Sequence, residues 1–261
     1  MTDHPIDPTA AGRRYEGKSV IVTGAASGIG RATALRIGAE GGKVWCADLN
    51  AEGAETAAKE IEAAGGTATA TAFDICDIPA SAALVEAVVA EWGALHVLCN
   101  IAGVGGMAHF AEESPERFDL MMAVNARGPY VLAQAALPHL LEVRGTIVNL
   151  ASTAGVIGQA YCSAYCASKH ALVGITRSLA IEFGRKGLNV NAVCPGGVNT
   201  PILGGFLPPE GASMSLVSRA FLDQNMQEPE SVAAMVAYLG SDEAHYVNGA
   251  TFSIDGGTTA G

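Results

Sequence analysis

The sequence predicts an α/β protein with a doubly wound, seven-stranded parallel sheet, helices on both faces of that sheet, and one domain. Short apolar runs of strand length alternate with stretches of helical spacing, an order typical of parallel sheets joined by crossover helices. The strands are apolar at successive positions, as expected for strands covered on both faces. No internal repeat or low-complexity linker divides the 261 residues, so we expect no second domain.

Three strand–helix pairs fill the first part of the chain. The first strand is a β-branched run, the third is rich in threonine, the second helix is rich in alanine and glutamate, and glycines follow the second and third helices. In chain order, the expected elements are strand Ser19–Thr23, helix Ala25–Ala39, strand Lys43–Ala47, helix Ala51–Ala64, strand Thr67–Phe73 and helix Pro79–Trp92.

Four further strands and three helices follow. Pro115 suits the first turn of a helix, whereas Pro129 and Pro138 are internal, so we expect a kink or break there. In chain order, the expected elements are strand Leu95–Asn100, helix Pro115–Leu141, strand Thr146–Leu150, helix Tyr161–Arg185, strand Asn189–Val193, helix Glu230–Leu239 and strand Ala250–Ile254.

Charge argues against two classes of partner. The chain has 15 basic and 26 acidic residues, a net charge of -11, which opposes binding to nucleic acid and to anionic membranes. No apolar run reaches the roughly 18 residues that span a bilayer. Residues 1–15 lack the apolar core of a signal peptide. We therefore expect a cytoplasmic protein with a flexible extension, 1–15, before the domain 16–261.

Cysteine and histidine spacing gives no sign of a metal site. The six cysteines form no CxxC pair, and Cys46, Cys99 and Cys194 fall in or beside apolar runs, as reduced core cysteines do. The six histidines show no ligand spacing, so we expect no metal.

A glycine-rich turn follows the first strand, at Thr23–Gly30 (TGAASGIG). Glycines permit a tight turn and a close approach of backbone to a pyrophosphate, and the next helix presents free N–H groups to that anion. A glycine trio alone is weak evidence, but its position between a strand and a helix is the expected context for dinucleotide binding.

Asp48 follows the second strand, 18 residues beyond Gly30, close to the separation expected for a carboxylate that binds the ribose hydroxyls of NAD. No arginine or lysine occurs in Leu49–Ala58 to receive the 2′-phosphate of NADP, which would meet like charge at Asp48. Asp48 could also be a turn or helix-capping residue. We expect NAD rather than NADP.

The other strand ends carry residues suited to the same ligand. Asp74-Ile75 can meet the adenine edge, although Asp74 is also a common turn residue. Asn100–Gly103 is small and polar, as needed where backbone passes a ribose. Pro195–Thr200 (PGGVNT) can wrap a nicotinamide, with the backbone of Val198 and the hydroxyl of Thr200 on its carboxamide. The carboxyl ends of parallel strands are where such ligands bind.

Tyr165 and Lys169 are four residues apart in a predicted helix, so their side chains share one face. An ammonium near a phenol favours the phenolate, and we expect it to lower the pKa of Tyr165 from about 10. Ser152 follows the fifth strand and can converge on the same pocket. A tyrosine and a lysine at this spacing also occur on helix surfaces without any function.

In this order and spacing, the motifs closely resemble those of the short-chain dehydrogenase/reductase family, from about Lys18 to Gly257. One departure is Ile101, where the family usually has a second asparagine, so some hydrogen bonding in the sheet has to be replaced. The matching elements are Thr23–Gly30, Asp48, Asp74, Asn100–Gly103, Asn125, Ser152, Tyr165–Lys169, Pro195–Thr200 and Asp255–Gly257.

The resemblance implies a Rossmann fold and hydride transfer between a nicotinamide and a carbonyl or alcohol carbon. Tyr165 would be the acid/base, Lys169 its partner on the nicotinamide ribose, and Ser152 the group that polarises the substrate oxygen. Asn125 would anchor a water linked to Lys169, or serve only at a helix kink. The expected cofactor-binding residues are Gly24, Ser27, Gly28, Ile29, Gly30, Asp48, Leu49, Asp74, Ile75, Asn100, Ala102, Gly103, Tyr165, Lys169, Pro195, Gly196, Val198 and Thr200.

Substrate choice is expected to lie in Gly105–Phe110, Val156–Cys162 and an apolar lid at about 200–228. An apolar lid favours a hydrophobic secondary alcohol or ketone: alicyclic, terpenoid, steroid-like or a dihydrodiol. Two alternatives are a 3-oxoacyl or other carbonyl reductase, which would use NADPH, and a catalytically silent NAD-binding regulator. The resemblance also implies a homotetramer, or else a homodimer, formed by the two long helices.

Overall fold

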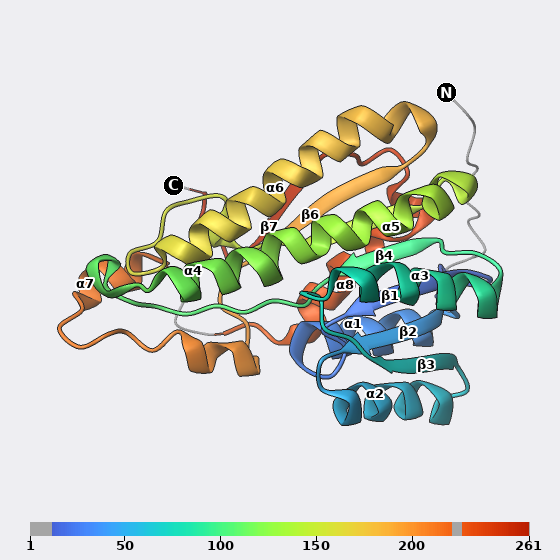
Figure 1. The fold of residues 1–261 in the computed structure, drawn as a ribbon, viewed down its shortest axis with the longest axis horizontal. Helices are drawn as coiled ribbons and strands as arrows, with labels where there is room; N and C mark the ends of the chain where they lie inside the picture. The colour runs from blue at the N-terminus through green and yellow to red at the C-terminus, as the bar shows by residue number, and fades with distance from the viewer. Residues whose placement is uncertain (1–11, 221–225, 261) are drawn as a thin grey trace.

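The computed structural model describes residues 12–220 and 226–260, and its sheet contains seven parallel strands in the order β3-β2-β1-β4-β5-β6-β7. Strand order reverses between β1 and β4, so the predicted doubly wound parallel sheet is confirmed (Figure 1). The strands are β1 (Ser19–Thr23), β2 (Lys43–Asp48), β3 (Thr67–Ala72), β4 (Val97–Asn100), β5 (Thr146–Leu150), β6 (Asn189–Pro195) and β7 (Thr251–Ile254).

Eight α-helices connect or follow these strands in the described part of the chain. They are α1 (Gly28–Ala39), α2 (Ala51–Ala63), α3 (Ile78–Trp92), α4 (Pro115–Met122), α5 (Gly128–Val143), α6 (Ser163–Phe183), α7 (Met214–Val217) and α8 (Pro229–Leu239). Ser114, Asn50 and Asp77 cap α4, α2 and α3 by accepting a backbone N–H at the first turn, which satisfies one free donor of each helix.

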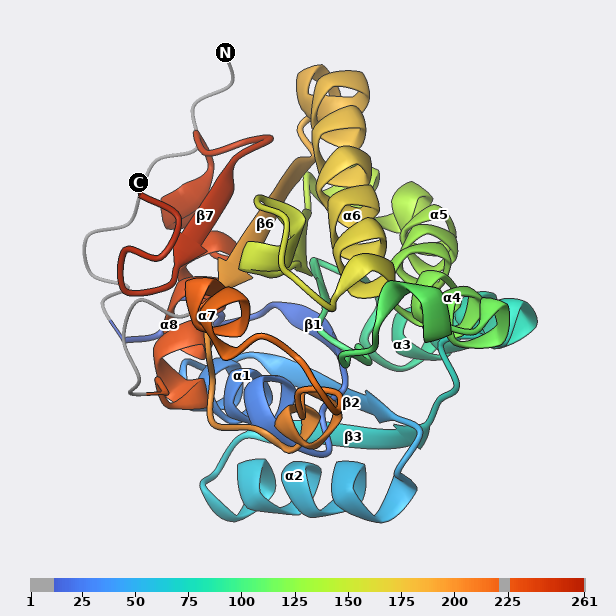
Figure 2. The ribbon, with the colours of Figure 1, turned by 90° about the vertical axis from the view of Figure 1, so that its left-hand side faces the viewer.

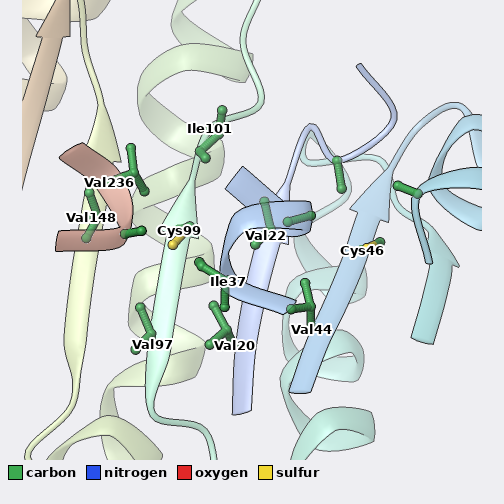
Figure 3. Close-up of a cluster of buried hydrophobic side chains, with 14 of the residues drawn as sticks. Val20, Val22, Ile37, Val44, Cys46, Val97, Cys99, Ile101, Val148 and Val236 are labelled. Carbon is green, nitrogen blue, oxygen red and sulfur yellow. The ribbon is translucent and has the colours of Figure 1, made fainter. Parts of the chain in front are cut away.

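Helices cover both faces of the sheet, as Figure 2 shows. On one face, α1, α2 and α8 enclose a core that includes Val22, Ile37, Cys99 and Val236 (Figure 3). On the other face, α3, α5 and α6 enclose a second core around Leu98, Leu132 and Ile147. Because both faces are covered, the inner strands are buried at nearly every position and largely apolar, whereas the edge strands β3 and β7 are only partly buried.

Two predicted helices begin later than expected. The first was expected from Ala25, but α1 begins at Gly28, because the residues before it form the turn that leaves β1. The long helix expected over 161–185 begins at Ser163. Tyr161 cannot belong to it, since its φ of 64° lies in the left-handed region.

The expected break near Pro129 takes the form of a π-helical segment, Ala123–Arg127, between α4 and α5. Pro129 then lies in the first turn of α5, where a missing N–H costs little. Of the kink or break expected at Pro138, the break does not occur, because Pro138 lies inside the continuous helix α5. It is on the exposed side, as is Gln134, whose carbonyl loses its partner and can be hydrated by water.

The folded domain starts earlier than the expected boundary at residue 16. Residues 1–11 of the expected extension lie outside the described residues. Tyr15 is fully buried, and its hydroxyl donates to the carbonyl of Ala237 in α8 at 2.7 Å. Arg14 pairs with Glu40 at the end of α1. These contacts fix the end of the segment to both α1 and α8.

All six cysteines are unpaired thiols. Among residues 12–220 and 226–260, no group of histidine, cysteine or carboxylate side chains has the arrangement of a metal site. No helix within the same residues is long and apolar enough to cross a membrane.

Candidate active site

A cleft of about 380 Å³ lies at the carboxyl ends of the strands, across the point where strand order reverses. All the predicted site residues except Asn100 and Asn125 line it. They come from the turn after β1, the ends of β2 and β3, the loop after β4, the segment after β5, α6, and the loop after β6. The topology therefore brings together residues that are up to 176 positions apart, from Gly24 to Thr200.

In the glycine-rich turn, the backbone at Gly30 packs directly against the backbone at Gly24. This tight turn keeps side chains out of the space where an anion would bind. A Cβ on Gly30 would lie 1.9 Å from the carbonyl oxygen of Gly24, so no other residue fits there without displacing the turn. Ser27, Gly28 and Ile29 then expose the first turn of α1 to the cleft. The Ser27 side chain makes no capping bond, so the free N–H groups of α1 face the space where a pyrophosphate would lie. This geometry fits a dinucleotide.

Asp48 ends β2 and lines the cleft beside Leu49. Its two carboxylate oxygens accept from the backbone N–H of Ala26, at 2.9 Å, and of Asn50, at 2.8 Å. The carboxylate thus braces the glycine turn and the start of α2. It remains a charged acceptor at the edge of the cleft. Asp74 has a similar local bond, accepting the N–H of Cys76 at 2.8 Å.

Asn100 lies buried in the sheet and, unlike most of the predicted cofactor-binding residues, does not line the cleft. Its Nδ2 donates to Asn149 Oδ1 on β5 at 2.8 Å, and Asn149 Nδ2 donates to Thr176 Oγ1 on α6 at 2.9 Å. This buried chain of amides cross-links β4, β5 and α6. The backbone beyond Asn100 still lines the cleft at Ala102 and Gly103.

Ile101 is packed in the core where the family has an asparagine, with only 6% of its surface exposed. The local hydrogen bonds come from Thr23 at the end of β1. The Thr23 hydroxyl accepts the backbone N–H of Ile101 at 2.9 Å and of Ala102 at 3.1 Å. This hydroxyl braces the β1–β4 junction without a side-chain amide at position 101.

Tyr165, Lys169 and Ser152 converge at the inner end of the cleft. Tyr165 and Lys169 are buried on one face of α6, with 8% and 3% of their surface exposed. The Lys169 Nζ lies 5.8 Å from the centre of the Tyr165 ring and donates to the carbonyl of Leu150, the last residue of β5, at 2.7 Å. The lysine is thereby anchored to the strand end that carries Ser152.

The expected lowering of the Tyr165 pKa was wrong for this structure. Burial raises the pKa of Tyr165 to about 12, and the hydrogen bond with Ser152 offsets only part of that rise. Burial also lowers the pKa of Lys169 to about 8, which weakens the ammonium that was expected to favour the phenolate. Desolvation disfavours the charged form of both groups and is the largest cause of both pKa changes.

Asn125 lies in the π-helical segment and is fully buried. Its side chain brackets the loop after β4, because Oδ1 accepts from the N–H of Val104 at 2.9 Å and Nδ2 donates to the carbonyl of Val104 at 2.8 Å. Nδ2 also contacts Ser168 Oγ on α6 at 3.0 Å. π-Helical turns often occur at functional sites. Here the turn supplies the asparagine that fixes the loop beside Tyr165; its water link to Lys169 stays a prediction.

Residues after β6 close the cofactor side of the cleft. Pro195, Gly196, Val198 and Thr200 all line it, as the sequence predicted. The Thr200 hydroxyl donates to the carbonyl of Val198 at 3.2 Å. Val198 also pairs with Gln227 in an isolated bridge, which ties this loop to the segment that precedes α8.

Beyond Tyr165 the cleft is lined by residues that sequence reasoning placed only within broad segments or, at Val104 and Thr153, did not single out. Most are apolar: Val104, Met107, Ile202, Leu203, Phe206 and Ala220. Gln159 and Thr153 are polar, and Gln159 Nε2 donates to Thr153 Oγ1 at 3.1 Å, which leaves the amide oxygen of Gln159 as an acceptor. No motif marks these positions, because each depends on how three loops fold over one another.

Comparisons with known proteins agree with this geometry. A family model described as enoyl-(acyl carrier protein) reductase matches residues 24–259. D-threitol dehydrogenase of Mycolicibacterium smegmatis is 37% identical over 94% of this chain and 94% of its own length. Cyclohexanol dehydrogenase of an Acinetobacter species is 36% identical over 95% of this chain and 97% of its own length.

Solved structures share the whole fold. A short-chain dehydrogenase from Mycobacterium paratuberculosis bound to NAD has a TM-score of 0.86 at 30% identity and covers 95% of this chain and 100% of its own. A short-chain dehydrogenase from Burkholderia cenocepacia in complex with NADP has a TM-score of 0.84 at 34% identity, covering 94% and 99%. Such structures thus hold either dinucleotide.

Proposed function

The chain belongs to the short-chain dehydrogenase/reductase family and is an oxidoreductase that uses a dinucleotide; we propose that it transfers hydride between NAD and a hydrophobic secondary alcohol. The observation that carries this proposal is the convergence of Ser152, Tyr165 and Lys169 in one cleft with the glycine turn. A protein that only binds a dinucleotide has no use for all three groups.

The side chains divide the chemistry in a simple way. The bound nicotinamide would supply the hydride acceptor for oxidation and the donor for reduction. Tyr165 takes the proton from the substrate hydroxyl in oxidation and returns it in reduction. Ser152 hydrogen-bonds the same oxygen. Lys169, held by Leu150, places a titratable amine beside the phenol, with a pKa lowered to about 8.

We infer a preference for NAD over NADP from Asp48. Its carboxylate lies at the edge of the cleft, and the segment Leu49–Ala58 offers no cation to a 2′-phosphate. Titration of the dinucleotides by calorimetry tests this inference. NAD should bind at least about tenfold more tightly than NADP, and Asp48→Ser should reduce that ratio. A preference for NADP would contradict the argument from Asp48.

The lining of the substrate side supports an apolar alcohol. Val104, Met107 and Phe206 pack against the apolar cluster that contains Tyr165, and Leu203 lines the same cleft. The amide oxygen of Gln159 can accept from one further hydroxyl. One relative is named for cyclohexanol, an apolar ring that would suit the apolar surface. Another is named for threitol, a polyol whose additional hydroxyl groups would suit the extra acceptor. We therefore propose alicyclic alcohols and dihydrodiols as the first compounds to test, ahead of terpenoid and steroid-like ones.

The test is a panel of secondary alcohols with NAD, followed by nicotinamide absorbance. Cyclohexanol and a cyclic vicinal diol should be oxidised. A protein that turns over only 3-oxoacyl thioesters with NADPH would instead be a carbonyl reductase, the activity for which a 36% identical relative, 3-oxoacyl-(acyl-carrier-protein) reductase of Thermotoga maritima, is named. Absence of turnover with every compound, alongside tight NAD binding, would favour a regulator instead.

Two further parts of the proposal concern the cellular location and the oligomeric state of the enzyme. Six unpaired cysteines suit a reducing compartment, so we propose a cytoplasmic location. Exposed apolar side chains on α4, α5 and α6, Phe118, Leu120, Tyr130 and Ile181, suit association of copies through these helices. Size-exclusion chromatography with light scattering should then give a homotetramer, or a homodimer.

A further inference from the structure

A strap of chain passes over the substrate side of the cleft between β6 and α8. Its described part, Pro201–Ala220, contains a short 3-10 turn over Pro201–Gly205 and then α7. Figure 2 shows this strap in orange, in front of the strands. Ile202, Leu203, Phe206 and Ala220 face the cleft from it.

Phe206 is the strap residue that contacts the catalytic tyrosine. Its ring lies edge-to-face on the Tyr165 ring, with centres 5.0 Å apart and planes at 79°. Room for the ring depends on Gly105 in the loop after β4, because a Cβ there would lie 2.5 Å from Phe206 Cζ and 3.0 Å from Tyr165 Cε2. Phe206 therefore fills a space that the absence of a side chain at position 105 creates.

Two aromatic residues hold the strap in this position. Tyr161 accepts the backbone N–H of Ser213 on its hydroxyl at 2.8 Å. His109 stacks edge-on against Tyr161, with ring centres 5.3 Å apart, and its Nε2 donates to the carbonyl of Glu210 at 2.8 Å. We call these two residues, with their bonds to Glu210 and Ser213, the latch.

Backbone bonds join the latch to the rest of the site. The N–H of Ala108 donates to the carbonyl of Tyr161 at 2.9 Å, and the N–H of Met107 donates to the carbonyl of Gly205, next to Phe206, at 3.0 Å. Tyr161 adopts a φ of 64° to make these contacts. A left-handed conformation is costly for a bulky residue and persists only where surrounding contacts impose it.

We propose that Phe206 is the residue that sets the size of substrate this enzyme accepts, and that Tyr161 and His109 act as positioning residues by holding Phe206 over Tyr165. The inference rests on the proposed function, since it concerns the same alcohol site. A substrate carbon that presents its oxygen to Tyr165 and Ser152 must place its ring beside Phe206. Compact rings fit under the phenyl group, whereas substituted or fused rings collide with it.

The first test is Phe206→Ala with alcohols of graded size: cyclohexanol, 4-tert-butylcyclohexanol and decahydro-2-naphthol. The ratio of kcat/KM for the fused ring to that for cyclohexanol should rise about tenfold or more, the scale on which a pocket discriminates groups of this size. Leu207→Ala is the matched control, because Leu207 is 73% exposed and does not line the cleft. An unchanged ratio, or an equal change in the control, would overturn the role of Phe206.

The second test does not depend on turnover. Tyr161→Phe removes the acceptor of the Ser213 N–H while keeping the ring, so hydrogen exchange in peptides covering 205–216 should accelerate about two- to tenfold. Tyr246→Phe is the control, since Tyr246 is 81% exposed. The size ratio of Tyr161→Phe should shift in the same direction as that of Phe206→Ala, but less.

The outcomes separate the two proposals. Accelerated exchange in Tyr161→Phe supports the latch even if no alcohol in the panel is oxidised, and that absence of oxidation would refute the proposed function alone. Exchange as slow as in the wild type would refute the latch. If cyclohexanol is oxidised but the ratio of kcat/KM for the fused ring to that for cyclohexanol is the same in Phe206→Ala as in the wild type, the inference is refuted and the proposed function stands.

Discussion

Lys169 is a buried ammonium whose lost hydration is replaced by little within the protein. Charging it should therefore lower the free energy of unfolding by an amount that depends on pH, and replacing Lys169 should reveal this cost. Only 3% of its surface is exposed, and its Nζ donates a hydrogen bond to the carbonyl of Leu150, which is a neutral group. Burial lowers its pKa from 10.5 to about 8. The folded protein therefore holds this proton less tightly than the unfolded chain does.

The sign and size of the effect follow from that difference. Between about pH 8 and pH 10.5 the unfolded chain binds more protons at this lysine, so this group makes the free energy of unfolding rise with pH. A pKa fall from 10.5 to about 8 corresponds to about 3 kcal/mol. Below pH 8 the folded state bears the full cost. Lys169→Met removes it.

Urea unfolding of Lys169→Met and wild type at pH 7 and pH 10.5 measures this cost. The stability of the variant relative to wild type should be about 3 kcal/mol more favourable at pH 7 than at pH 10.5. The buried thiols titrate in both proteins and should cancel in the comparison, except that of Cys194, whose pKa is raised by burial and lowered in part by Lys169. Lys59→Met, whose side chain is 73% exposed, is the control. A relative stability that is the same at both pH values would refute the desolvation of Lys169.

Three further outcomes are expected. Tyr165→Phe should lower kcat about 10²- to 10⁴-fold and leave the NAD dissociation constant within about twofold; retained turnover would reject the acid/base role. Because burial raises the pKa of Tyr165 to about 12, alcohol oxidation should accelerate as pH rises and ketone reduction should not, and a flat oxidation profile between pH 7 and 10 would contradict this. Tyr15→Phe should cost about 1–3 kcal/mol in urea unfolding by leaving the Ala237 carbonyl unpaired, an effect that exposed Tyr246→Phe should not share.

The sheet could be predicted from sequence because its signals are local. Most strands are short apolar runs, β3 is a short run rich in β-branched threonine, and the turn after β1 carries its own glycines. The same local reasoning could not exclude a break at Pro138, which does not occur, since a proline is tolerated inside a helix when it lies on the exposed side. It also placed Tyr15 in an extension, because a single aromatic residue in a polar segment gives no sign of the α8 carbonyl that it reaches.

The sequence allowed the residues of the site to be predicted, but not the pKa values of their side chains. Ser152, Tyr165 and Lys169 occupy one cleft, as their spacing indicated. The direction of the Tyr165 pKa could not be predicted, because it depends on how much solvent the surrounding loops remove. Phe206 was visible only as one apolar residue of a lid. Its contact with Tyr165 requires a glycine 101 positions earlier in the chain, at Gly105.

The π-helical segment Ala123–Arg127 also sets how α5 is rotated about the helix axis relative to α4. One extra residue in a turn rotates everything beyond it by about 100° around the helix axis. Before the segment, α4 packs on α6; after it, α5 packs on α3. Deleting one residue here would restore a regular helix, but α5 would then turn its buried stripe away from the sheet. The π-helical segment therefore sets which face of α5 is buried, and losing it would require the core around Leu132, Ala136 and Leu140 to repack.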